Sequence, residues 1–445
     1  MRSFLRHITL LGSAWFAFVA SVTAQSYTVT TIAGLAGVSG AADGTNSTAR
    51  FYRPSGLAVD GAGNIYVADH LNHTIRKIAP AGTNWVVSTL AGLAGTLGSA
   101  DGTNDQARFN QPHAVAVDTN GDLFVTDNYN QTIRKITRVG TNWVVSTVAG
   151  VALTKGSDDG TNSQARFNSP EAIAVDSSGR LYVTDRLNFT VREVSPSGTN
   201  WVTSTLAGTA SIYGGFVDGP NGDAEFNLPW GIARHSGGNL YVADWGNNAI
   251  RRISPVGPDW VTSTVAGFSG ARGTNDGPAS QAKFYSPNGI AVDASETLYV
   301  TDQYNHTIRK IALVGNSWVV STVAGLAGQA GSADGTGTSA RFAYPWGIAL
   351  DGAQGFYVAD EVNNTIRWAT PALAPSPVLH MLLASNQVVL SWSTAAGNFV
   401  LETTPALGTG AFWVGVTNGV SVSGNDYSFT NVVGPAPAFF RLRGP

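Results

Sequence analysis

The sequence of 445 residues contains no cysteine. This absence excludes disulfide bridges, thiolate-bound metal ions and a cysteine nucleophile. Charged residues are also scarce, at 12% of the chain, whereas glycine is abundant with 52 copies. Because few ion pairs and no covalent cross-links are available, we expect the fold to depend on packing and on closure of its architecture.

An excess of basic residues is missing as well. The formal net charge is -3, and removal of residues 1–24 would leave 24 basic and 29 acidic residues, a formal charge of -5. Nucleic-acid binding requires a basic surface that neutralises phosphates, so we exclude nucleic acid as a partner. The sequence also shows no recognisable Ser-His-Asp arrangement and no glycine-rich phosphate loop.

Long apolar runs are few, and the clearest one lies near the start. A basic beginning with Arg2 and Arg6 precedes the apolar residues 8–20 and the small-residue pattern of residues 22–24. This order predicts a secretory signal peptide over residues 1–24 that is removed before Gln25. No later apolar run reaches the roughly 20 residues that a membrane-spanning helix needs. We therefore expect a secreted or periplasmic protein without membrane insertion.

Six copies of one segment fill the chain from Tyr27 to Thr370. Each copy carries Phe-x-x-Pro-x-(Gly/Ala), then x-(Tyr/Phe)-Val-(Ala/Thr)-Asp, then Asn-x-(Thr/Ala)-(Ile/Val)-Arg. A fixed period of this length is typical of a repeat architecture. The aspartate that ends the second block recurs every 58 or 59 residues, at Asp69, Asp127, Asp185, Asp244, Asp302 and Asp360.

Four runs within one copy have the character of short strands. Residues 85–91, 114–118, 123–127 and 132–136 are rich in Val, Ile, Thr or aromatics and are bounded by Gly, Asn, Asp or Pro. Four strands in each of six copies predict an all-β fold, a six-bladed β-propeller over residues 25–370. A single blade cannot bury both of its faces, so the blades must form a ring.

The two ends of the repeat region complement each other. The last copy lacks an outer strand after Trp368, whereas residues 29–34 align with residues 87–92, and Tyr27 takes the place of Trp85. We therefore predict that the N-terminal strand completes the last blade and closes the propeller, which removes an exposed sheet edge.

A separate module is expected after the repeats. Residues 371–377 read as a Pro-rich linker, and residues 378–445 contain runs of alternating apolar and polar residues at 387–392, 399–403 and 412–416, with a final run at 439–443. These runs predict a small β-sandwich. Their pattern resembles the fibronectin type III-like modules at the ends of many exported bacterial proteins. A spacer, an adhesion module and an export tag are all open as its role.

The repeat itself resembles a known family. Residues 72–78 read Asn-His-Thr-Ile-Arg-Lys-Ile, residues 305–311 repeat these letters, and both resemble the signature of NHL repeats. The resemblance extends over all six copies and implies a β-propeller. NHL propellers include peptide and protein binders, RNA binders, sensor domains of bacterial kinases and a metal-dependent amidating lyase, so the resemblance selects no function.

Positions that are alike in all copies are expected to serve the blade. Asp69, Asn72 and Arg76 suit a turn in which the arginine reaches back to the carboxylate. The Asp-Gly sequences, such as the one at Asp43, lack the full spacing of a calcium loop, and we interpret them as turns. One phenylalanine per copy is expected to fill the gaps between blades: Phe51, Phe109, Phe167, Phe226, Phe284 and Phe342.

Positions where the copies differ are candidates for one site on the axis. The residue after the repeat proline, at the entry of the innermost strand, forms an inner ring of Ser55, His113, Glu171, Trp230, Asn288 and Trp346. The residue after the repeat aspartate forms an outer ring of His70, Asn128, Arg186, Trp245, Gln303 and Glu361. Both rings are expected on one face of the propeller, where loops on a rigid scaffold commonly carry function.

This mixture of side chains predicts a ligand-binding surface. Aromatic faces supply contact area and scattered polar groups fix orientation, which suits a sugar ring or an extended peptide. The expected partner is an extracellular or periplasmic protein, peptide or glycan. The alternative without a ligand is that Trp230 and Trp346 simply fill the channel mouth.

Catalysis is the second hypothesis. His113, Glu171 and Asn288 are candidate ligands for a divalent metal ion, calcium or zinc, on the channel axis, and His70 is a further candidate. Resemblance to the NHL-type amidating lyase and to gluconolactonase-type propellers implies a metal-dependent lyase or lactonase at the same mouth. Of the six inner-ring positions, only His113 matches the histidines of the lyase, and the sequence identifies no catalytic residue.

Overall fold

The computed structural model describes residues 25–372, 379–384, 387–393, 400–404, 414–416, 418–423, 426–432 and 439–443. These residues fall into two compact units, one over Gln25–Ala372 and one within Leu373–Pro445. The predicted signal peptide and residues 373–377 of the predicted linker lie outside the described residues. No helix in the described ranges is long and apolar enough to cross a membrane.

The larger unit contains six antiparallel sheets of five strands each. In the first sheet, β3 (Pro54–Val59), β4 (Ile65–Asp69), β5 (Thr74–Ala81) and β6 (Asn84–Ala91) follow in order, and β2 (Gly44–Thr45) pairs with the outer edge of β6. The predicted strands are therefore present, with boundaries shifted by a few residues. The two-residue fifth strand escaped prediction because it is too short to show a pattern.

The next four sheets repeat this order. The second has β8 (Pro112–Val117), β9 (Leu123–Asp127), β10 (Thr132–Val139), β11 (Asn142–Gly150) and β7 (Gly102–Thr103). The third has β13 (Pro170–Val175), β14 (Leu181–Asp185), β15 (Thr190–Ser197), β16 (Asn200–Ala207) and β12 (Gly160–Thr161). The fourth has β18 (Pro229–Arg234), β19 (Leu240–Asp244), β20 (Ala249–Val256), β21 (Asp259–Gly267) and β17 (Gly219–Pro220). The fifth has β23 (Pro287–Val292), β24 (Leu298–Asp302), β25 (Thr307–Val314), β26 (Ser317–Ala324) and β22 (Gly277–Pro278).

The sixth sheet joins strands from both ends of the unit. Its order is β27 (Gly335–Thr336), β1 (Tyr27–Gly34), β30 (Thr365–Pro371), β29 (Phe356–Asp360) and β28 (Pro345–Leu350). Strand β1 is antiparallel to β30, with Tyr27 opposite Pro371 and Gly34 opposite Thr365. It holds the place that β6 holds in the first sheet, which confirms the predicted pairing of the N-terminal strand.

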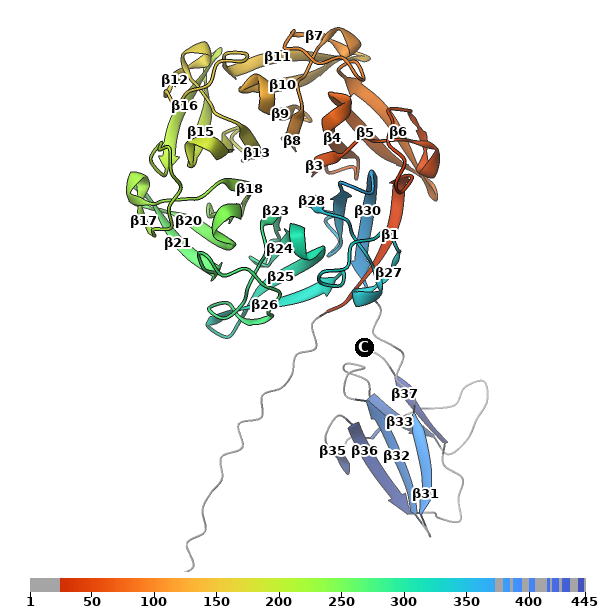
Figure 1. Cartoon of the computed structure of the whole chain (residues 1–445). Helices are drawn as coiled ribbons and strands as arrows, with labels where there is room; N and C mark the ends of the chain where they lie inside the picture. Colours follow the sequence, from red (N-terminus) through yellow and green to blue (C-terminus); the bar gives the residue numbers. More distant parts are fainter. Residues whose placement is uncertain are drawn as a thin grey trace, which may run out of the picture. The chain divides into compact units, whose positions relative to one another are not determined.

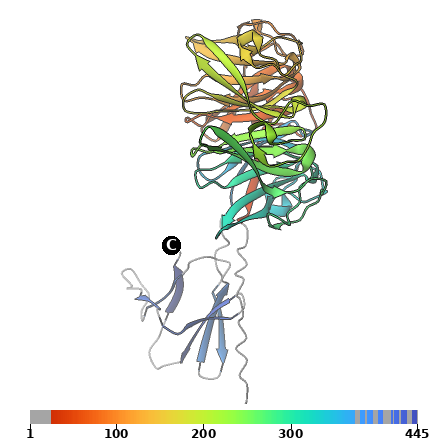
Figure 2. The same ribbon diagram turned by 90° about the vertical axis from the view of Figure 1, so that its left-hand side faces the viewer.

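The six sheets are arranged around a common centre, with β3, β8, β13, β18, β23 and β28 innermost (Figure 1). Figure 2 shows the same unit from the side. Neighbouring sheets share apolar cores. Phe51, for example, packs in one cluster with Val67 of β4 and Ile366 of β30. All six equivalent phenylalanines are fully buried, which confirms that they fill the gaps between sheets. This arrangement is consistent with a β-propeller.

A buried ion pair fixes the turn between the second and third strands of each sheet. In the first sheet, Arg76 Nη1 donates to Asp69 Oδ2 at 2.7 Å, and Asn72 Nδ2 donates to the same oxygen at 2.8 Å. Arg76 Nη2 also donates to Asp43 Oδ1 at 2.7 Å, and the guanidinium lies over the Phe51 ring. The predicted reach of the arginine back to the aspartate is confirmed.

The Asp-Gly sequences do not form the predicted turns, because the glycine begins the two-residue fifth strand, as Gly44 begins β2. The aspartate instead has a role that the sequence did not reveal. Asp43 accepts hydrogen bonds from the backbone N–H of Thr89 at 3.0 Å and from its hydroxyl at 3.0 Å. The carboxylate therefore covers part of the outer edge of β6, beyond the reach of β2. The equivalent Asp334 binds Thr31 of β1 in the same way. These contacts occupy donors that an exposed edge strand would present to other chains.

A further hydrogen bond links consecutive sheets. His73 Nδ1 accepts from the backbone N–H of Gln111, and His306 Nδ1 accepts from that of Tyr344. The same contact joins the last sheet to the first, where Asn364 Oδ1 accepts from the N–H of Arg53 at 2.9 Å. Burial lowers the pKa of His73 and of His306. Both histidines thus serve the repeat frame.

The smaller unit is also all-β. One sheet has the order β31 (His380–Ala384), β32 (Gln387–Ser393), β36 (Asp426–Val432) and β35 (Val420–Ser423), and the other has β34 (Val414–Gly415), β33 (Val400–Thr404) and β37 (Phe439–Arg443). Trp392 and Leu390 of the first sheet share a core with Leu401 of the second. Strands β31, β35 and β36 were not predicted. Likeness to fibronectin type III modules stays a prediction.

The buried ion pair makes a first testable prediction. Arg134→Met leaves Asp127, which is fully buried, without its cation. We expect a loss of about 3–5 kcal/mol in the free energy of unfolding, because an uncompensated charge remains in the interior. Lys135→Met is the matched control on the same strand, since its pair with Asp122 is partly exposed and should contribute less than about 1 kcal/mol. Denaturant unfolding that shows equal losses for both variants would contradict this account.

Strand β1 makes a second prediction. Its residues Tyr27, Val29, Ile32 and Ala33 are buried. Deletion of residues 26–34 therefore removes this packing and leaves the edge of β30 without its partner strand. At roughly 1.5–3 kcal/mol for each large apolar side chain, the unit should lose on the order of 5 kcal/mol. We expect a clearly lower melting temperature in calorimetry. An unchanged melting temperature would show that β1 adds little to the fold.

Candidate functional site

Both variable rings lie at one end of the sheets. The repeat proline begins each innermost strand and pairs with the repeat aspartate, as Pro54 does with Asp69. The residue after each partner therefore lies at the same end. In five sheets the outer-ring residue opens a short 3-10 turn: η2 (His70–Asn72), η4 (Asn128–Asn130), η6 (Arg186–Asn188), η8 (Trp245–Asn247) and η9 (Gln303–Asn305). The predicted shared face of the two rings is confirmed.

Trp230 is the centre of an aromatic cluster. Its ring lies 5.2 Å from that of Trp346 and 5.4 Å from that of Trp245, measured between centroids. The imidazole of His113 lies 6.3 Å from Trp230 and 5.5 Å from Trp346. These side chains come from the second, fourth and sixth sheets, so they meet across the common centre. Trp230 is only 8% exposed.

An ionic chain borders this cluster. Glu171 pairs with His113 through Oε2 and Nδ1, and its Oε1 lies 3.0 Å from Arg186 Nε. The guanidinium of Arg186 also lies over the Trp230 ring, 4.7 Å from its centroid. Glu171 is buried, and a buried carboxylate needs such partners. The chain thereby fixes the orientations of His113 and Trp230.

Several ring members bind only the scaffold. Ser55 Oγ donates to the carbonyl oxygen of His113 at 2.6 Å, and Asn128 Nδ2 donates to that of Pro170 at 3.0 Å. Trp245 Nε1 donates to Gln303 Oε1 at 3.1 Å, which links two outer-ring residues. The structure thus brings the predicted residues together, but it gives Ser55 and Asn128 structural contacts.

Apart from the ion-paired atoms of His113, Glu171 and Arg186, three buried polar atoms in the rings have no hydrogen-bond partner among the described residues. They are Trp230 Nε1, Asn288 Nδ2 and His70 Nδ1. Burying such a group without a partner costs about 1–3 kcal/mol. Two of the three are donors only, so a group that reached them would have to offer oxygen acceptors.

The donor set does not fit the predicted metal ion. Both oxygens of Glu171 are occupied, one by His113 and one by the guanidinium of Arg186, whose positive charge opposes a cation. No group of three or more His, Cys, Asp or Glu residues in the described ranges is arranged to hold a metal. His113, Glu171 and Asn288 are therefore not arranged as a set of metal ligands.

Two ring residues have shifted acidities. Burial lowers the pKa of His70 well below its usual value, and the nearby His113, 4.5 Å away between ring centroids, adds to this effect. Burial raises the pKa of Glu361 to about 7, although the exposed Arg53 lies 3.3 Å away and opposes the shift. His70 is thus neutral at neutral pH, and Glu361 holds its proton to a higher pH than an exposed glutamate does.

Sequence reasoning missed Arg53. It precedes the repeat proline, and its equivalents are Gln111, Ser169, Leu228, Ser286 and Tyr344. All six have positive φ angles between 51° and 59°, so this third variable position belongs to a strained turn beside the rings. Its variation between copies was the available signal.

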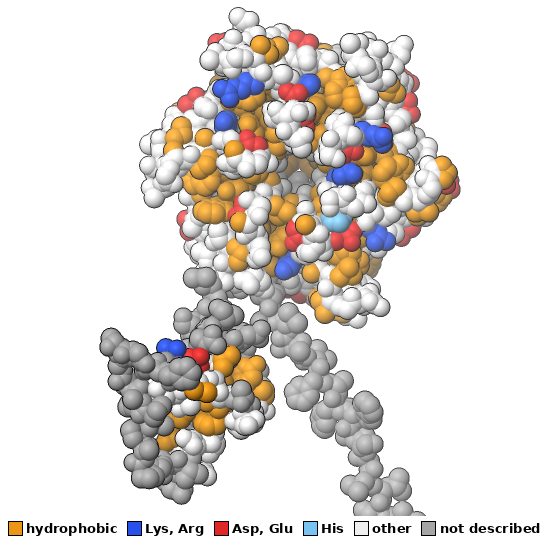
Figure 3. Space-filling view, turned by 180° about the vertical axis from the view of Figure 1, so that it is seen from behind, with side chains coloured by type: hydrophobic (Ala, Val, Ile, Leu, Met, Phe, Trp, Pro, Cys, Tyr) orange, Lys and Arg blue, Asp and Glu red, His pale blue; other side chains and the backbone are white. Residues whose placement is uncertain are grey.

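Figure 3 shows one face of the molecule, which is hollowed at the centre and carries side chains of both charges around the hollow.

Comparison with known families decides the type of repeat. Residues 51–78, 226–253 and 284–311 match the NHL repeat, and residues 98–195 match the teneurin NHL domain. Three of the six copies therefore match the NHL repeat. The matched segments include residues 72–78 and 305–311, where the sequence alone showed the resemblance.

The curated proteins that resemble this chain have diverse names. It is 28% identical over 338 residues to Protein SUPPRESSOR OF QUENCHING 1, chloroplastic, of Arabidopsis thaliana, covering 71% of this chain and 30% of that one. It is 26% identical to Peptidyl-alpha-hydroxyglycine alpha-amidating lyase 1 of Drosophila melanogaster, covering 57% and 43%. The matches thus span less than half of these curated relatives.

A solved structure shares the fold of this chain. An auxiliary nutrient binding protein from Bacteroides thetaiotaomicron superposes with a TM-score of 0.57 at 18% identity, covering 78% of this chain and 76% of that one. At this identity the likeness concerns the fold.

The titration of Glu361 makes a third prediction. Between its usual pKa of 4.5 and its folded value of about 7, the folded chain holds a proton that the unfolded chain has released. Wild-type stability should therefore fall as the pH rises through this window, by up to about 3 kcal/mol from this group. Glu361→Gln removes the titration, so the variant should gain stability over wild type from about pH 5 to about pH 8. Unfolding curves with a constant difference between the two proteins would contradict the raised pKa.

Proposed function

We propose that the protein is an exported NHL propeller that binds a ligand at the variable face, through the inner ring and the neighbouring Arg186 and Trp245. One observation carries the proposal: buried, unpartnered polar atoms of Trp230, Asn288 and His70 border one aromatic cluster. A ligand with oxygen acceptors, such as a glycan or a peptide, would satisfy the two donors and rest on aromatic faces. The name of the nutrient binding protein is consistent with a binding role on this fold.

We also infer that the six sheets are the blades of a closed six-bladed propeller. The pairing of β1 with β30, the hydrogen bond from Arg53 to Asn364 and the core shared by the first and last sheets support closure. Export, to the periplasm or to the medium, is inferred from the pattern of residues 1–24. Residues 378–445 are inferred to form a separate β-sandwich module, on the evidence of two sheets with one shared core.

The binding hypothesis makes a fourth prediction. The chain from Gln25 onward, screened on glycan and peptide arrays, should give a hit whose affinity falls about tenfold or more in Asn288→Ala and in Arg186→Gln. Arg252→Gln is the control, because Arg252 lies on β20 opposite Tyr241, toward the other end of the strands. Hits that bind both ring variants as tightly as wild type would place the site elsewhere.

Metal analysis separates this proposal from catalysis. The amidating-lyase relative makes a metal-dependent lyase or lactonase the alternative. The guanidinium of Arg186 beside Glu171 leads us to expect no stoichiometric divalent ion in the purified protein. A stoichiometric calcium or zinc ion that is lost in both His113→Ala and Glu171→Ala would contradict the binding proposal and favour the enzyme.

A further inference from the structure

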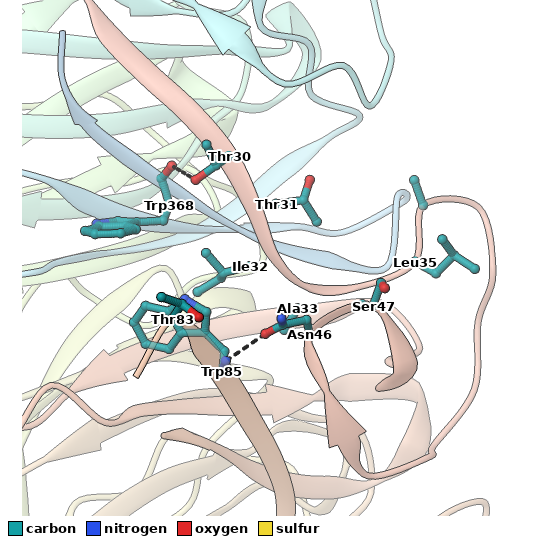
Figure 4. A pocket seen from close by; sticks show the side chains of 12 residues that line it. Thr30, Thr31, Ile32, Ala33, Leu35, Asn46, Ser47, Thr83, Trp85 and Trp368 are labelled. Carbon is teal, nitrogen blue, oxygen red and sulfur yellow. Dashed lines mark hydrogen bonds between the residues drawn. The ribbon is translucent and has the colours of Figure 1, made fainter. Parts of the chain in front are cut away.

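A groove of about 550 Å³ lies between the outer strands of the last and first sheets. One wall comes from β1, with Thr30, Thr31 and Leu35, and the other from Ser47, Thr83 and Trp85 of the first sheet (Figure 4). Trp368 of β30 also lines it. This groove is lined by residues of the outer strands, whereas the inner ring lies on the innermost strands, and nothing in the proposed function uses it.

The groove breaks the symmetry of the repeats at one position. Trp368 pairs with Thr30 in the sixth sheet, just as Lys77 pairs with Ser88 in the first. The other residues at this register position are also charged: Lys135, Glu193, Arg252 and Lys310. Only the sixth sheet, where both ends of the repeat region meet, therefore carries a tryptophan at the position that holds a charged residue in the other five sheets.

The aromatic wall is held in place. Trp368 stacks on Tyr357 with 6.0 Å between ring centroids and an angle of 25°, and it meets Trp85 nearly edge-on at 6.0 Å and 72°. Its indole Nε1 donates to Asp351 Oδ2 at 3.0 Å. Because both its packing and its hydrogen bond are fixed, the indole is preorganised, and a ligand need not order it.

The polar groups of the groove are neutral. Among its lining residues, hydroxyl and amide side chains accompany the two tryptophans, and no Asp, Glu, Lys, Arg or His is present. Ser47 and Thr83 are exposed, and Asn46 is held by its bond to the backbone N–H of Trp85 at 2.7 Å. A charged ligand would find no counter-charge among the lining side chains, although Asp334 binds Thr31 and Arg50 donates to the carbonyl oxygen of Ser47.

We propose that this groove binds a neutral carbohydrate chain, with sugar rings against Trp85 and Trp368 and sugar hydroxyls on the Ser, Thr and Asn side chains. Sugars combine apolar ring faces with many hydroxyl groups, which matches aromatic faces beside neutral polar side chains. A peptide added as a strand fits less well. The edge of β1 is already engaged by β27 at Thr28 and Val29 and by Asp334 at the N–H of Thr31.

The test measures binding of cellohexaose, maltohexaose and laminarihexaose to the chain from Gln25 onward by titration calorimetry, with a hexamer of galacturonic acid as the charged probe. At least one neutral hexaose should bind, and the acidic one should bind more weakly. Trp368→Lys installs the residue that three other sheets carry at this position, so the variant should fold and lose affinity about tenfold or more. Thr83→Arg, an exposed change that fills the groove, should do the same.

Two controls separate this site from others. Lys310→Ala, at the equivalent position of the fifth sheet, and Arg252→Gln, at the equivalent position of the fourth sheet, should leave hexaose binding unchanged. The proposal is overturned if no neutral hexaose binds, if the acidic probe binds as well as the neutral ones, or if Trp368→Lys and Thr83→Arg bind like wild type. Loss of hexaose binding in Asn288→Ala, with binding retained in Trp368→Lys, would place the carbohydrate at the variable face. This result would also overturn the proposal of a binding groove.

Discussion

The buried bond between the repeat aspartate and arginine holds the rest of the larger unit in register. Asp69 accepts from Arg76, from Asn72 and from the backbone N–H of Tyr52, so one carboxylate ties together the turn, the third strand and the segment entering the innermost strand. Arg76 extends the network to Asp43 and thereby to the outer strand. Burying both charges costs free energy unless their hydrogen bonds are made. This requirement fixes the path of the segment that enters the innermost strand of each sheet.

That constraint explains why variation is concentrated at two rings. The residues directly after Pro54 and Asp69 follow positions that the network fixes, yet they are not part of it: Ser55 Oγ, for example, donates to the carbonyl oxygen of His113. Exchange of one such side chain leaves the ion pair intact. Side chains as different as those of Ser55 and Trp230 can therefore occupy equivalent backbone positions. The scaffold thus tolerates a histidine, a carboxylate and two tryptophans within contact of one another.

Sequence patterns predicted what depends on local spacing. Residues 123–127 were predicted as a strand and form β9 with the same bounds, and Tyr27 lies where the alignment with Trp85 places it. Contacts across the centre could not be predicted, because they depend on the distances between strands of different sheets. For this reason the pairing of Glu171 with both His113 and Arg186 escaped prediction, and that pairing removes the basis of the predicted metal site. The two-residue strands and β31 lack a period long enough to detect.

The pairing of β1 with β30 in the sixth sheet differs from the equivalent strand pairs of the other five sheets, which short turns connect. Strand β1 joins β30 without a hairpin, so side chains must supply the specificity that a short turn supplies elsewhere. Tyr27 and Tyr299 share a hydrogen bond at 3.0 Å, and Thr28 and Thr336 share another at 2.9 Å. Trp368 adds stacking on Tyr357 where the other sheets have a charged residue. An aromatic residue that strengthens the junction also removes the ion that would otherwise line the groove. The tryptophan at position 368 therefore both stabilises the sixth sheet and leaves a neutral aromatic surface beside it.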